Sequence, residues 1–153
     1  MTIEARLLEL GITLPPAPPP VAAYEPWVRT GNLVFTSGQL PWRGGELAYV
    51  GRVGGELTEQ QGYEAARICA INAIAQLKNA TGDLETIVRI VRCDGFVHAA
   101  PGFHRHPVVL NGASELINAV FQQAGRHTRV ALGIADMPLN AAVQVALLAE
   151  IRD

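Results

Sequence analysis

The chain has 153 residues, of which 49% are hydrophobic and 17% are charged, and its formal net charge is −2. This length predicts one domain that buries roughly 70% of its unfolded surface. A charged fraction below the roughly 25% of an average soluble domain favours an oligomer that hides part of that surface. Lysine and arginine together number 12, and Lys78 is the only lysine, so the sequence lacks the basic excess of a protein that binds nucleic acid.

The sequence has no cysteine or histidine pattern typical of a metal site. Cys69 and Cys93 form neither a CxxC pair nor a metal-binding spacing, and we predict that both are core residues. His104 and His106 form an HxH pair without a third ligand at zinc spacing, which favours an exposed loop over a metal site.

No apolar run reaches the roughly 18 residues of a membrane span, and the acidic start MTIEARLLELGI does not resemble a signal peptide. We therefore expect a cytoplasmic protein.

The first twenty residues differ from the rest. Residues 3–10 have a helical pattern, and Gly11 follows at the position where helices commonly end. Prolines then dominate residues 15–20 and exclude helix and interior strand, which predicts an extended strap. We expect residues 1–20 to form this N-terminal helix and strap, and residues 21–153 to form the main domain.

Three strands are expected before the first long helix. Residues 27–30 and 33–37 are rich in β-forming side chains, and the Gly31-Asn32 pair between them is a standard hairpin signal. Glycine and proline end the second strand. Residues 47–53 are then expected to form a third, short strand.

The remaining elements alternate between helix and strand. Residues 58–61 (TEQQ) match a capping box, and apolar residues recur at helical spacing from there to Gly82. We further predict a buried strand over 87–97, a loop over 98–112, a second helix over 113–124, and strands over 129–134 and 142–151. The order β-β-β-α-β-α-β-β fits an α+β fold with one sheet and two helices on one face.

Arg129 is the most informative residue, because it is a charged side chain next to the apolar, strand-like run VALGI. A guanidinium stays protonated at physiological pH, so a half-buried arginine needs an anionic partner. That partner is either a carboxylate of the protein or a carboxylate of a ligand.

Several motifs occur in an order and at distances that resemble the Rid/YjgF family. They are Tyr24, the segment GNLVFTSGQLP at residues 31–41, Arg129, and Met137-Pro138 followed by the final strand. The resemblance covers residues 21–151, and the N-terminal helix, the strap and the PGF…NGAS segment suggest a distinct branch. Members of this family are known as reactive intermediate deaminases, or as L-PSP endoribonuclease-like proteins.

The resemblance implies a chorismate-mutase-like fold, assembled as a homotrimer with three ligand clefts between subunits. By family analogy, Arg129 binds the substrate carboxylate, Tyr24 borders the cleft, and Ser37-Gly38-Gln39 lines it. The implied reaction is hydrolysis of a 2-imino or enamino acid to a 2-keto acid and ammonia, without a metal or organic cofactor. An imine carbon is already electrophilic, so the protein mainly has to hold the carboxylate and aim one water.

One position departs from the family pattern. Gln144, six residues after Pro138, stands where the family has a glutamate that positions or activates the attacking water. An amide can orient a water but cannot accept its proton. His127 offers a substitute base, because residues two apart on a strand face the same way, which places it beside Arg129. A neutral imidazole can accept a proton near neutral pH.

Each of these residues also has a purely structural explanation. Arg129 can form a salt bridge to an Asp or Glu of another subunit. Tyr24 can pack the strap against the sheet, and Ser37 and Gly38 can simply end a strand, where glycine permits a close approach. His127 can be a surface histidine.

Three functions are compatible with these residues. The first is a small trimeric deaminase of 2-imino or enamino acids, in which Arg129 binds the carboxylate. The second is a non-catalytic trimer that binds a small carboxylate metabolite or a partner protein at the same clefts, which Gln144 would explain directly. The third is RNA cleavage, which ranks last because a net charge of −2, one lysine and 6% aromatic residues offer little phosphate affinity or base stacking.

Overall fold

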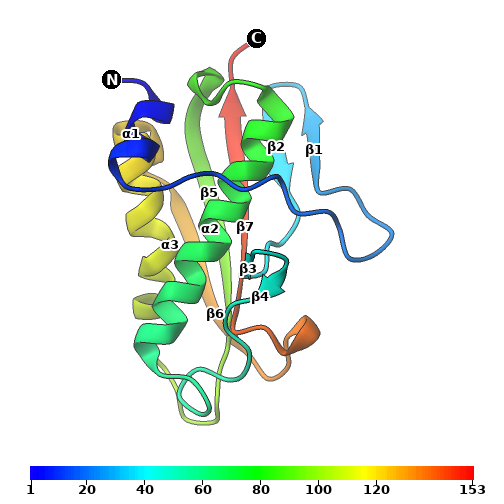
Figure 1. Cartoon of the computed structure of the whole chain (residues 1–153), viewed down its shortest axis with the longest axis vertical. Helices are drawn as coiled ribbons and strands as arrows, with labels where there is room; N and C mark the ends of the chain where they lie inside the picture. The colour runs from blue at the N-terminus through cyan, green and yellow to red at the C-terminus, as the bar shows by residue number, and fades with distance from the viewer.

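Three α-helices and seven strands make up the chain, and the computed structural model describes residues 1–153 (Figure 1). The helices are α1 (Ile3–Glu9), α2 (Glu59–Thr81) and α3 (His106–Phe121), with short 3-10 helices η1 (Leu84–Thr86), η2 (Gln122–Gly125) and η3 (Pro138–Asn140). The strands are β1 (Trp27–Thr30), β2 (Leu33–Thr36), β3 (Trp42–Arg43), β4 (Glu46–Leu47), β5 (Ile87–His98), β6 (Thr128–Ile134) and β7 (Val143–Ile151).

Five of the strands form one sheet in the order β1-β2-β7-β5-β6, and β3 and β4 form a separate hairpin. Neighbouring strands are antiparallel except β5 and β6, which are parallel. A parallel pair needs a long crossover connection, and α3 with η2 supplies it. The crossover leaves β6 as an outer strand of the sheet, directly beside α3.

Alternating side chains along β7 define the two faces of the sheet. Its odd-numbered residues, from Val143 to Ile151, are buried. The helices α2 and α3 lie on this side, as Figure 1 shows, which confirms the predicted single sheet with two helices on one face. Because side chains of a strand alternate with a period of two, Gln144 points to the opposite face.

The contact between α2 and α3 sets the position of the whole helical layer. The predicted capping box is present at the start of α2, where Thr58 Oγ1 accepts from the N–H of Gln61 at 3.1 Å and the Gln61 side chain accepts in return. At Gly112, α3 approaches α2 so closely that a Cβ would collide with the carbonyl of Tyr63. This close contact fixes α3 over β5 and β6.

The N-terminal segment belongs to the same core. Ile3, Leu7 and Ile12 are buried in the main hydrophobic cluster. The proline strap crosses α2 in an extended conformation (Figure 1), and there Gln76 Nε2 donates to the carbonyl of Pro18 at 2.7 Å. The predicted N-terminal helix and extended strap are confirmed.

The face of the sheet opposite the helices is exposed over much of its area and carries both apolar and charged side chains, the latter including Arg92 and Asp94 of β5, which form a salt bridge. Val28 of β1 lies beside Phe35 of β2, which in turn lies beside Leu148 of β7. Val28 and Phe35 are 52% and 44% exposed, and Leu132 of β6 is 52% exposed. The exposed apolar side chains on this face are suited to contact with another protein surface.

The third strand predicted over residues 47–53 is wrong. In its place, β3 and β4 form a hairpin around Gly44 and Gly45, whose φ values of 62° and 82° lie in the region that favours glycine. The chain after β4 makes only isolated bridges to other segments. Gly51, with a φ of 120°, interrupts the extended run there.

The loop predicted over 98–112 is too long, and the helix predicted over 113–124 begins earlier, at His106. Pro107 suits the first turn of a helix, where its missing N–H would have no partner. His106 is therefore helical and half-buried, and burial, followed by the charge of His104, lowers its pKa. His104 itself is exposed, as expected.

Both cysteines are buried in the core, as predicted. Burial raises the pKa of Cys93 to about 12, so its thiol stays neutral and acts as a small core residue. Among the helices, none combines the length and the apolar character that a bilayer crossing requires.

Candidate functional site

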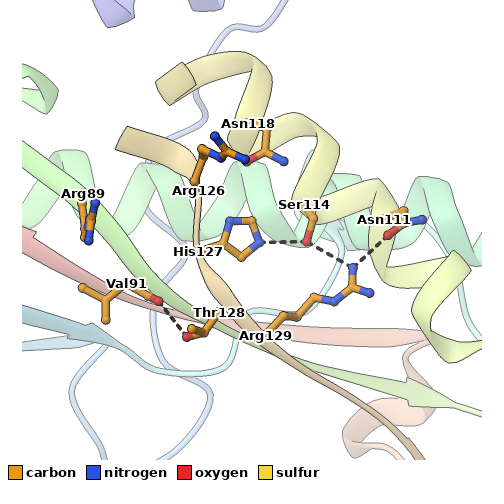
Figure 2. A pocket seen from close by; sticks show the side chains of 9 residues that line it. All are labelled: Arg89, Val91, Asn111, Ser114, Asn118, Arg126, His127, Thr128 and Arg129. Carbon is orange, nitrogen blue, oxygen red and sulfur yellow. Dashed lines mark hydrogen bonds between the residues drawn. The ribbon is translucent and has the colours of Figure 1, made fainter. Parts of the chain in front are cut away.

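The candidate site is a polar pocket between the start of β6, the first half of β5 and α3 (Figure 2). Its cavity has a volume of about 640 Å³, and only one of its nine lining residues is hydrophobic. These residues, called the Arg129 pocket below, are Arg89, Val91, Asn111, Ser114, Asn118, Arg126, His127, Thr128 and Arg129. Three are arginines and none is Asp or Glu, so the pocket favours an anionic ligand. No group of three or more His, Cys, Asp or Glu side chains is placed to hold a metal ion.

Two neighbouring elements position the polar side chains. Asn111, Ser114 and Asn118 are three and four residues apart on α3, so they form a stripe along one side of the helix. His127 and Arg129 are two residues apart where β6 begins and therefore point the same way. Figure 2 shows both side chains directed toward the stripe on α3.

Arg129 has only neutral partners in this chain. Its Nη1 donates to Asn111 Oδ1 at 2.9 Å and to Ser114 Oγ at 3.2 Å, and its Nη2 donates to the carbonyl of Pro107 at 3.3 Å. None of the five salt bridges of the chain involves it. The three acceptors hold the planar group in place without neutralising its charge, which leaves it able to bind a carboxylate.

His127 is held by two hydrogen bonds. Its Nδ1 lies 2.5 Å from the carbonyl of Gly125, which can only accept, so Nδ1 carries the proton and donates. In the neutral ring Nε2 is then an acceptor, and Ser114 Oγ, at 2.9 Å, donates to it. A chain of hydrogen bonds therefore runs from Arg129 through Ser114 to His127, and the expectation that the arginine and the histidine point the same way is confirmed.

The other residues that the sequence predicts to be part of the site lie together, away from the Arg129 pocket. This Gly38 surface, as it is called below, consists of Tyr24, Ser37, Gly38 and Gln144. A Cβ at position 38 would collide with Gln144 Oε1, so the Gln144 side chain lies directly against Gly38 and would have to move if a larger residue replaced the glycine. Backbone hydrogen bonds of 2.8 and 3.0 Å between Gln39 and Val145 keep Gly38 over Gln144.

Side chains around the Gly38 surface differ in their exposure to solvent and in their hydrogen-bond partners. Tyr24 is 44% exposed and lines a small hollow together with Gly38 and the end of the strap. Ser37 Oγ donates to a backbone carbonyl at 2.6 Å. Gln39, which the resemblance places in the cleft, lines the same hollow as Tyr24, and its buried side chain accepts from Gln76 of α2 at 3.3 Å.

The two locations lie on opposite faces of the sheet. Arg129 is in the same cross-strand row as Cys93 and Leu147, and both of these side chains are buried under the helices. Gln144 pairs with Phe96, which is three residues after Cys93 and so points to the other face. One chain therefore does not bring Arg129 and Gln144 together.

The pocket contains Arg129 and His127, which the sequence suggests as site residues, together with Asn111 and Ser114, which it does not. Asn111 fell in a predicted loop, which concealed the spacing of three and four residues along α3. Starting the helix at Pro107, a residue that is common in first turns, would have revealed the polar stripe.

Comparisons with known proteins agree with this architecture. The chain matches the family model described as YjgF/chorismate mutase-like, putative endoribonuclease, over residues 4–151. It is 40% identical to Protein TCP17 of Trypanosoma cruzi over 152 residues, which are 99% of this chain and 95% of that protein. A crystal structure of a putative endoribonuclease from Shewanella oneidensis is 40% identical, with a TM-score of 0.96, over 99% of this chain and 100% of that one. The Agrobacterium tumefaciens protein Atu1372, of unknown function, is 44% identical, with a TM-score of 0.92, over 98% and 92% of the two chains.

The chain belongs to the YjgF/chorismate-mutase-like family, which is the Rid/YjgF family that its motifs resemble. The family match begins at residue 4, so it includes α1 and the proline strap. The fold and the family expected from the sequence are therefore confirmed.

Replacing Asn111 with aspartate tests whether Arg129 is free to bind an anion. The new carboxylate would lie beside Arg129 Nη1, where Asn111 Oδ1 is now 2.9 Å away, and would occupy the guanidinium as a salt bridge. We expect Asn111→Asp to weaken the binding of pyruvate, measured by calorimetry, by at least about tenfold. Asn79→Asp makes the same charge change at an exposed position of α2 and serves as the control. Pyruvate binding that is unchanged in Asn111→Asp would show that Arg129 does not contact the anion.

Proposed function

We propose that this protein hydrolyses 2-imino or enamino acids to 2-keto acids and ammonia, with Arg129 binding the substrate carboxylate. One observation carries the proposal: Arg129 keeps its full positive charge in a polar pocket where every hydrogen-bond partner is neutral. A guanidinium matches a carboxylate with two parallel hydrogen bonds. Such a contact would fix both the position and the orientation of the adjacent imine carbon.

The proposed reaction depends on an oriented water rather than on a strong nucleophile. The water oxygen forms a bond to the electrophilic imine carbon while one of its protons is transferred to the nitrogen, which gives a carbinolamine. The C–N bond then breaks as the second proton moves from oxygen to nitrogen, so the carbon keeps the oxygen as a ketone and the nitrogen leaves as ammonia. The pocket contributes mainly by holding the carboxylate and the water in one geometry. Residues able to accept and return a proton would lower the barrier further.

Proton transfer is assigned to His127 acting through Ser114. The Gly125 carbonyl keeps the proton on Nδ1, so Nε2 is the basic atom, and it already accepts from Ser114 Oγ. A water bound to Ser114 can therefore pass a proton along this pair. Gln144 cannot accept that proton, and its amide would instead orient the water.

A second copy of the chain would bring Gln144 close to Arg129. Gln144 lies on the uncovered face of the sheet, whereas Arg129 lies on the helix side of the outer strand β6. In a cyclic homotrimer the outer strand of one chain can meet the uncovered face of the next. The exposed side chains of Val28, Phe35 and Leu132 would supply apolar contact area for this assembly. Each cleft would then combine the Arg129 pocket of one copy with the Gly38 surface of another.

A non-catalytic protein that binds a small carboxylate metabolite is the second candidate. Two observations favour it: Gln144 is an amide where the family has a glutamate, and His127 is already engaged by Ser114. Both candidates use the Arg129 pocket for the carboxylate. They differ only in whether the bound molecule is turned over.

Ammonia release from freshly generated 2-imino acids separates the two candidates. An amino-acid oxidase supplies the imine, and the wild type is compared with Arg129→Ala and Gln144→Glu. For a deaminase we expect turnover in the wild type and a loss of about 100-fold in Arg129→Ala, because the substrate is no longer held in the reactive orientation. Gln144→Glu should raise the rate, since a carboxylate can accept the proton of the water.

Arg43→Ala is the control, because it removes an exposed arginine on β3 that lies outside both locations. Absence of turnover in the wild type, with activity appearing in Gln144→Glu, would identify the non-catalytic binder. Turnover that persists in Arg129→Ala would contradict the assigned role of Arg129.

Mixed oligomers test whether each cleft is built from two copies. Gln144→Arg places a second cation opposite Arg129, so it should block the cleft by repulsion, while Arg129→Ala removes the anion contact. We expect each variant alone to sediment at three times the 16.4 kDa chain mass and to be inactive. Co-expression of the two variants should restore part of the activity, because some clefts then combine two intact halves. A monomeric wild type, or no restoration in co-expressed trimers, would contradict the composite cleft.

A further inference from the structure

Two further arginines line the Arg129 pocket, and the proposed chemistry does not use them. Arg126 directly follows η2, and Arg89 lies near the start of β5. Both side chains are exposed, and neither takes part in any of the five salt bridges of the chain. The pocket thus carries more positive charge than one substrate carboxylate neutralises.

Half of the eight arginines outside the Arg129 pocket are paired. Arg29, Arg52, Arg92 and Arg105 each form a salt bridge to an Asp or Glu. The three arginines of the Arg129 pocket form none, although they gather around one cavity. Like charges in one cavity repel each other and create a field that concentrates anions. Such a field favours a ligand with more than one negative charge.

Acidic side chains on the neighbouring elements do not neutralise the pocket. Glu115 of α3 points toward α2, where it accepts from the Tyr63 hydroxyl at 2.5 Å and thereby raises the pKa of Tyr63. Glu150 of β7 is the cross-strand neighbour of Arg89 on the face of the sheet that also carries Gln144, and the two side chains form no salt bridge. Arg89 therefore lines the pocket from the other side of the sheet, beyond the start of β6. A cation is also favoured beside a helix C-terminus, which accounts for Arg126 alone and not for three arginines.

The dimensions of the pocket also exceed those of one carboxylate. Its volume of about 640 Å³ is in the range of pockets that hold a whole small-molecule ligand. The stripe from Asn111 to Asn118 extends about 10 Å along α3, at 1.5 Å per residue. Figure 2 shows Arg126 and Asn118 on the far side of His127 from Arg129, so the pocket has polar groups at both ends.

We infer that the ligand carries a second anionic group, bound by Arg126 and Arg89, at the end of the pocket away from Arg129. This inference rests on the proposed binding of the 2-carboxylate at Arg129, and it narrows the substrate class to 2-imino acids with an acidic side chain. The second group is a carboxylate or a phosphate, because guanidinium groups bind both through charge-assisted hydrogen bonds.

Calorimetric titration with matched 2-keto acids tests the second anion site. 2-Oxoglutarate and 2-oxopentanoate have the same carbon chain and differ by the terminal carboxylate, and 3-phosphohydroxypyruvate provides the phosphate. For the wild type we expect one dianion to bind about tenfold or more tightly than 2-oxopentanoate. Arg126→Gln and Arg89→Gln should each reduce that preference. Arg43→Gln removes the same charge outside the pocket and should preserve it.

Two outcomes would overturn the inference. One is equal affinity of the wild type for the three keto acids, and the other is a preference for a dianion that persists in both pocket variants. Either result would leave a carboxylate site at Arg129 intact. Failure of the proposed function has a different signature: tight, Arg126-dependent binding of a dianion with no ammonia released from the corresponding imine. Absence of binding by all three acids would overturn both.

Discussion

The positive charge of Arg129 is the constraint on which the site depends, because a guanidinium cannot be neutralised by losing a proton. The chain surrounds this group with an amide, a hydroxyl and a backbone carbonyl, all of which accept hydrogen bonds and none of which carries charge. An intrachain salt bridge is therefore absent. The anion that completes the site has to come from a ligand or from another copy, and we assign it to a ligand.

The fold places that charge through contacts far from the pocket. Gly112 lets α3 approach α2 at the carbonyl of Tyr63, and the parallel pairing of β5 with β6 then sets the start of β6 against the polar stripe of α3. Because strand faces alternate, the same sheet directs Gln144 to its uncovered side. One chain therefore carries the Arg129 pocket and the Gly38 surface on opposite faces of its sheet, and we propose that a second copy brings the two together.

Local sequence patterns predict the family and most helices and strands, and they fail where contacts between distant parts of the chain determine the structure. The capping box at Thr58, the hairpin at Gly31 and the position of Arg129 beside an apolar run are features of a few neighbouring residues. The sequence does not reveal the start of α3, because proline and glycine in this segment are typical of a loop. In the structure, Gly112 lies inside α3 and allows its close contact with α2. The separation of Arg129 from Gln144 depends on the strand order β7-β5-β6, which periodicity along the chain does not reveal.

A crystal structure of the protein with a 2-keto acid bound tests the central claim most directly, because it shows what neutralises Arg129. We predict that the carboxylate of the keto acid accepts two hydrogen bonds from the Arg129 guanidinium, with Gly38 and Gln144 of a second copy forming the facing wall. A salt bridge between Arg129 and an Asp or Glu of the second copy, with the keto acid bound elsewhere, would contradict the assigned role of Arg129.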